Sequence, residues 1–93
     1  MNVYAAIATS PTSVPAIASN LAQRFPGKFM EAGDRLWFVA DEGTTFSVSE
    51  KLGVKGKAGG EITSIVILPV TTYWGHANPA VWEWIKNQLE AKP

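Results

Sequence analysis

The sequence predicts an α+β domain with one four-stranded antiparallel sheet, and three observations support this. Four short apolar segments are typical of strands. Segments between them carry apolar residues at helical spacing. The Gly33-Asp34 pair is a two-residue hairpin signal. With 93 residues and a hydrophobic content of 46%, the chain can build one modest core, so we take residues 1–93 as a single domain.

The first half of the chain predicts a strand followed by a helix. Residues 2–9 are apolar on both faces of a strand, and residues 10–13 form a turn. Residues 14–25 predict a helix, because their apolar side chains recur every three or four positions. Pro26-Gly27 ends this helix.

The second half begins with the two strands of the hairpin, at residues 28–32 and 35–40. A short helix then runs from about Thr45 to Leu52, with Gly53 suited to its C-terminal cap. Strand residues follow from Ile62 to about position 69 or 70, after a basic, glycine-rich loop.

A final helix opens at Asn78-Pro79 and runs to about Ala91. The element order is therefore strand, helix, strand, strand, helix, strand, helix. This order predicts a ferredoxin-like βαββαβ sandwich with one extra C-terminal helix. We expect the first and last strands at or near the sheet centre, and two crossover helices over one face.

An apolar surface is predicted on the sheet face opposite the crossover helices. Alternate strand residues share a face. We assign to this open face the alternating sets that contain Tyr4, Trp37 with Val39, and Thr63. An exposed apolar area larger than roughly a few hundred Å² usually marks an interface. The final helix, a second subunit or a ligand can cover this face.

The final helix carries one apolar stripe and one spare aromatic residue. The stripe is Val81, Trp82, Ile85 and Leu89, at about 100° per residue. Trp84 lies off this stripe, so it either flanks the core or meets a partner. The candidate interface or ligand surface comprises Tyr4, Trp37, Val39, Trp74 and Trp84.

The charge balance and the absence of cysteine exclude several classes of function. Eight basic and eight acidic residues give a net charge of zero, which argues against nucleic acid as the main partner but leaves room for a local basic patch. No cysteine is present, which excludes disulfides and thiolate metal sites and fits a reducing cytoplasm. No signal peptide or run of ~18 apolar residues is visible. We therefore expect a cytoplasmic protein without a membrane partner.

Polar residues that can carry chemistry are few. Ser10 stands at a helix mouth that can hold an anion, and Asp41 belongs to a carboxylate pair that can bind a cation. Lys55 and Lys57 lie in a glycine-rich loop that can touch a phosphate. His76 is the single histidine. Capping, turn formation and loop solvation explain these residues more simply, so no catalytic, cofactor-binding or metal residue is predicted.

Several segments carry a family resemblance: Val3-Tyr4-Ala5-Ala6-Ile7, Gly33-Asp34, Leu36-Trp37-Phe38-Val39, Trp74-Gly75 and Trp82-Glu83-Trp84-Ile85. The chain resembles small ferredoxin-like proteins related to the CRISPR-associated adaptation subunit first described as a metal-dependent nuclease. The resemblance implies homodimers formed through the sheets and C-terminal segments. Active members have an aspartate at the end of the first strand, paired across the dimer. Here that region reads Ala8-Thr9-Ser10, so the resemblance implies a non-catalytic relative.

These observations favour a small homodimeric binding or scaffolding module without catalytic activity. One alternative is a regulatory domain that binds a small molecule at the dimer seam or on the open face. A pocket bordered by Tyr4, Trp37 and the loop at residues 55–57 would support this alternative. Another is a nuclease-like relative associated with nucleic acid.

Overall fold

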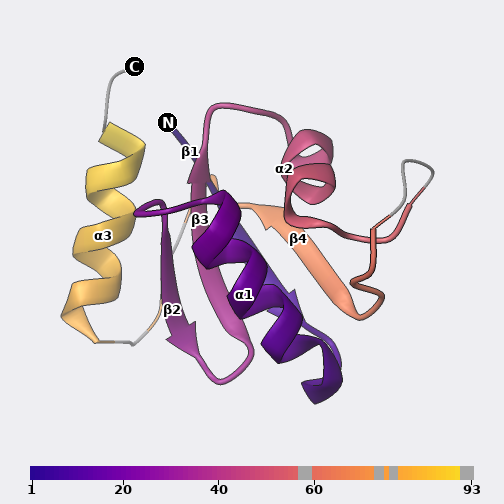
Figure 1. Ribbon diagram of the computed structural model, residues 1–93. Coiled ribbons are helices and arrows are strands. Elements are labelled where there is room, and N and C mark those ends of the chain that lie inside the picture. Colours follow the sequence, from indigo (N-terminus) through magenta and orange to yellow (C-terminus); the bar gives the residue numbers. More distant parts are fainter. Residues whose placement is uncertain (57–59, 73–74, 76–77, 91–93) are drawn as a thin grey trace.

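The computed structural model describes residues 1–56, 60–72, 75 and 78–90. Its elements are β1 (Asn2–Ala8), a short 3-10 helix η1 (Pro11–Ser13), α1 (Val14–Arg24), β2 (Phe29–Gly33), β3 (Leu36–Asp41), α2 (Thr45–Leu52), β4 (Ile65–Pro69) and α3 (Pro79–Glu90) (Figure 1). The predicted α+β class and the order of strands and helices are confirmed.

The four strands form one antiparallel sheet in the order β2-β3-β1-β4. β1 lies at the centre as predicted, but the prediction of a central position for the last strand is wrong, because β4 is an edge strand. β4 also begins later than Ile62. Ile62 forms a parallel bridge with Val54, and its N–H donates to the Gly53 carbonyl at 3.0 Å. The end of α2 therefore holds Ile62 outside the sheet.

Local capping explains where the helices begin and end. The Thr44 hydroxyl accepts a hydrogen bond from the Ser47 N–H at 3.1 Å, so Thr44 caps the N-terminus of α2. Gly53 ends α2 with a φ of 94°, a left-handed conformation that favours glycine. The Asn78 side chain accepts from the Ala80 N–H at 2.9 Å and caps α3 as predicted.

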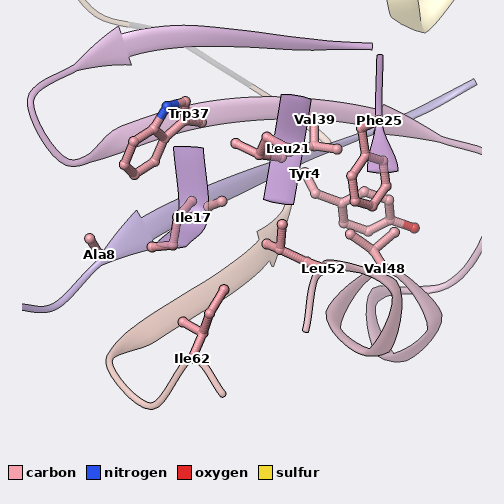
Figure 2. Close-up of a cluster of buried hydrophobic side chains, with 11 residues drawn as sticks. Tyr4, Ala8, Ile17, Leu21, Phe25, Trp37, Val39, Val48, Leu52 and Ile62 are labelled. Carbon is pink, nitrogen blue, oxygen red and sulfur yellow. The ribbon is translucent and has the colours of Figure 1, made fainter. Parts of the chain in front are cut away.

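The main core lies between the sheet and the pair α1 and α2 (Figure 2). Its residues are Tyr4, Ala6, Ala8, Ile17, Leu21, Phe25, Trp37, Val39, Val48, Leu52 and Ile62. Aliphatic side chains of the two helices meet the aromatic side chains of the sheet here. Ala6 lies opposite Trp37 in the strand register, and its small side chain leaves room for the indole.

The predicted assignment of the sheet faces is therefore wrong. Tyr4, Trp37 and Val39 were expected on the open face, but all three are buried under α1 and α2. Burying the large rings removes the most apolar area from water, so the face with two helices takes them. Of the set that contains Thr63, the β4 residues Ile65 and Ile67 pack against the same core.

α3 packs on the opposite face of the sheet, where it contacts β1 and β2. In Figure 1 it stands apart from α1 and α2. Val3 and Ala40 are paired across β1 and β3 and point away from the main core. Both are 1% exposed, and Val81 and Ile85 of α3 are buried too. These four side chains form a second, smaller core under α3.

Candidate interaction surface

The α3 face of the sheet carries two apolar rows that cross three strands. Phe38, Ala5 and Leu68 pair across β3, β1 and β4. Leu36, Ile7 and Val66 form the neighbouring row. We call these six residues the β4-side patch. All six are apolar, and adjacent members are directly opposite one another, so the patch is continuous.

Exposure rises across the patch toward the sheet edge. The four residues on β1 and β3 are half-buried. On β4, Val66 is 41% exposed and Leu68 is 49% exposed. Only one other large hydrophobic side chain among the described residues is exposed to this degree, Phe46 on α2. α3 therefore covers one part of this face and leaves the part near β4 open.

The α3 stripe predicted from the sequence is confirmed at its centre. Val81 and Ile85 are buried, while Trp82 and Leu89 are half-buried. Trp84 is half-buried as well, although it was placed off the stripe. The docked side of α3 is thus broader than the predicted stripe, and Trp84 flanks it.

Asp41 is engaged in a turn. Its Oδ2 accepts a hydrogen bond from the Gly43 N–H at 2.9 Å, and its Oδ1 lies 3.6 Å from Lys51 Nζ. The Gly43 carbonyl in turn accepts from the Tyr4 hydroxyl and from Asn2 Nδ2. This turn ties the end of β3 to the start of β1 and satisfies the buried tyrosine hydroxyl.

The other described polar candidates, Ser10 and Lys55, lie on different segments from Asp41. The Ser10 hydroxyl accepts from the Thr12 N–H at 3.3 Å and caps η1. Lys55 is exposed. Lys57, Trp74 and His76 fall outside the described residues. No group of three or more potential metal ligands occurs within the described part of the chain.

A shallow polar depression of 340 Å³ lies where α1 and α2 end. It is lined by Asn20, Arg24, Glu50, Gly53, Gly60 and Glu61. Asn20 Nδ2 donates to the Leu52 carbonyl at 2.8 Å, and Arg24 Nη1 donates to the Lys51 carbonyl at 3.1 Å. These donors satisfy free carbonyls at the end of α2. Their side chains therefore hold the two helices together, which is a structural task.

This depression differs from the pocket expected for a small-molecule regulator. That pocket was to be bordered by Tyr4 and Trp37, and both side chains are buried in the main core. Sequence reasoning missed Asn20 and Arg24. Their spacing of four residues on the polar side of a helix is a signal that both reach the same neighbour.

The chain matches no family model, no curated protein and no solved structure. In the described part of the chain, no helix is both long enough and apolar enough to cross a membrane. Function is therefore inferred from the β4-side patch and its surroundings.

Proposed function

We propose that the protein is a non-catalytic binding or scaffolding module that forms homodimers through the β4-side patch. The observation that carries this proposal is the exposure of Val66 and Leu68 at the end of two continuous apolar rows. An apolar surface of this kind is typical of a contact site. Zero net charge removes one barrier to self-association.

The free energy gained by burying this patch indicates how much of the stability of an interface it can supply. Complete burial of a valine or leucine side chain stabilises by about 1.5–3 kcal/mol, so about 1 kcal/mol remains available at each of Val66 and Leu68. Two copies together gain on the order of 4 kcal/mol from these side chains. A micromolar dimer needs about 8 kcal/mol. The interface therefore requires further contacts beside the patch.

The absence of catalysis in this proposal rests on the polar candidates. Asp41 and Ser10 use their side-chain oxygens to hold turns. A reducing cytoplasm is the proposed setting, because none of the 93 residues is cysteine.

We propose further that the fold is the ferredoxin-like βαββαβ sandwich with one extra helix. The strand order β2-β3-β1-β4 supports this, since each crossover helix then joins two strands that have one other strand between them. The relationship to the CRISPR-associated adaptation subunit is a proposal of the same kind. It rests on the sequence resemblance, and β1 ends at Ala8 without the aspartate of active members.

Light scattering coupled to size exclusion, at micromolar concentration, tests the proposal. The expected mass is twice the 10.0 kDa of one chain. A monomer mass at every micromolar concentration measured would overturn the proposed homodimer. Leu68→Asp should restore the monomer, because it places a charge in the patch. Phe46→Asp is the matched control: Phe46 is 72% exposed but lies on α2, outside the patch, so this variant should remain dimeric.

A further inference from the structure

β4 has a hydrogen-bonding edge that the sheet leaves open. The Val70 N–H donates to the Val3 carbonyl at 2.8 Å, and the Thr9 N–H donates to the Ser64 carbonyl at 3.0 Å. Even-numbered residues of this segment therefore direct their backbone groups toward β1. By strand geometry, the N–H and C=O groups of Ile65 and Ile67 and the carbonyl of Pro69 point outward. Within the described residues, no strand pairs with this edge.

The edge also lacks the charges that usually protect an edge strand. Exposed edges are commonly blocked by charged side chains, above all lysine. The sequence from Ile62 to Trp82 contains no Asp, Glu, Lys or Arg. In a two-fold pairing each side chain lies opposite its own copy or close to it, so a charge here would bring two like charges near each other. An uncharged strand is compatible with a second copy of itself.

We infer that two copies join edge to edge through antiparallel pairing of their β4 strands, about a two-fold axis at Ile67. This inference rests on the proposed homodimer and specifies how its two copies meet. In this register Ile67 exchanges hydrogen bonds with Ile67 of the second copy. Each Ile65 N–H donates to the Pro69 carbonyl of the other chain. The missing N–H of proline limits the pairing to this short segment.

The side chains favour this register over its neighbour. With the axis at Ile67, Val66 of one copy lies opposite Leu68 of the other, so the two most exposed patch residues cover each other. The apolar row of Leu36, Ile7 and Val66 then continues into the row of Leu68, Ala5 and Phe38 in the second copy. With the axis at Val66 instead, Leu68 would face Ser64. The backbone hydrogen bonds supply the contacts that the patch alone lacks.

Amide hydrogen exchange tests the pairing on the unaltered chain. The outward N–H groups of Ile65 and Ile67 are unpaired in a monomer and paired in the dimer. Their exchange should slow by about tenfold or more at high protein concentration and recover on dilution. The Leu68 N–H, which faces β1, should be protected at both concentrations. Equal exchange of the Ile67 amide in monomer and dimer would overturn the edge pairing.

Disulfide trapping tests the register, because the natural chain has no cysteine to interfere. Val66→Cys and Leu68→Cys chains should form a mixed covalent dimer on mild oxidation, since directly opposite residues bring their Cβ atoms within about 4.5–5.5 Å. Each variant alone, and Phe46→Cys, should cross-link at least tenfold more slowly. Rapid self-cross-linking of Val66→Cys would overturn the axis at Ile67. A dimer by light scattering without any cross-link at these positions would overturn the edge pairing but leave the homodimer standing. A monomer by light scattering would overturn both.

Discussion

The two faces of the sheet are built from alternate residues of the same strands, yet they are covered to different extents. On the face under α1 and α2, Trp37 is 2% exposed and the core is closed from β3 to β4. On the α3 face, exposure rises from 1% at Val3 to 49% at Leu68. Two helices cover the first face and one covers the second. The closed face thus holds the main core, and the open part of the other face is available to a partner.

The largest loss of stability is expected from a cavity in the closed face. Trp37→Ala should lower the free energy of unfolding by about 3–5 kcal/mol, because it removes the largest buried side chain of the main core. Urea denaturation followed by circular dichroism measures the change. Trp84→Ala is the matched control, since this tryptophan is only half-buried and should cost clearly less. Equal losses in the two variants would contradict the assignment of the faces.

The docking of α3 gives the next largest effect. Ile85→Ala should destabilise by about 2–3 kcal/mol, because Ile85 is fully buried against the sheet. Its neighbour Lys86 is exposed on the same helix, so Lys86→Ala should change stability by no more than about 0.5 kcal/mol. Denaturation curves of the two variants at one protein concentration provide the comparison. If Ile85→Ala were as neutral as Lys86→Ala, α3 would not contribute to the fold.

The difference between the faces could not be predicted from the sequence, although most elements could. Caps such as Gly53 fix where elements end, and this cap was predicted correctly. The hairpin was predicted as well, but its turn lies at Asp34-Arg35 and not at Gly33-Asp34, because Gly33 still pairs with Leu36 as the last residue of β2. The two-residue period shows which residues share a face but not which face receives the helices. The set with Ala5 and Phe38 is as apolar as the set with Tyr4 and Trp37. Both sets also place an alanine opposite an aromatic residue, Ala6 opposite Trp37 and Ala5 opposite Phe38, so strand pairing alone does not distinguish the faces.

The candidate surface was predicted less well, for a related reason. The sequence indicates an apolar face with partial cover, and that much is confirmed. It does not reveal that β4 is an edge strand, because a strand that is apolar on both faces suggests a central position. The proposed second copy explains why β4 is apolar on both faces. Val66 and Leu68, on the face away from the main core, are left exposed by the chain itself and are covered in the proposed dimer.

A smaller effect tests how the closed face accommodates a polar group. Tyr4→Phe should destabilise by about 1 kcal/mol, because the Gly43 carbonyl loses the buried tyrosine hydroxyl as a donor. Asn2 donates to the same carbonyl from an exposed position, so Asn2→Ala should cost less. Thermal unfolding of both variants shows which of them loses more stability. A larger loss in Asn2→Ala would mean that the turn is held from the surface.

The smallest expected loss of stability is at Leu68. It gives the most direct comparison of the two faces, because the adjacent residue Ile67 lies on the opposite face of the same strand. Leu68→Ala should change the free energy of unfolding by less than about 1 kcal/mol, since Leu68 is 49% exposed. Ile67→Ala should cost about 2 kcal/mol, because Ile67 packs against the main core. Urea titrations at protein concentrations low enough to keep the chain monomeric exclude any contribution from a partner. Since strand neighbours point to opposite faces, a reversed order of these two losses would place the main core on the other side of β4.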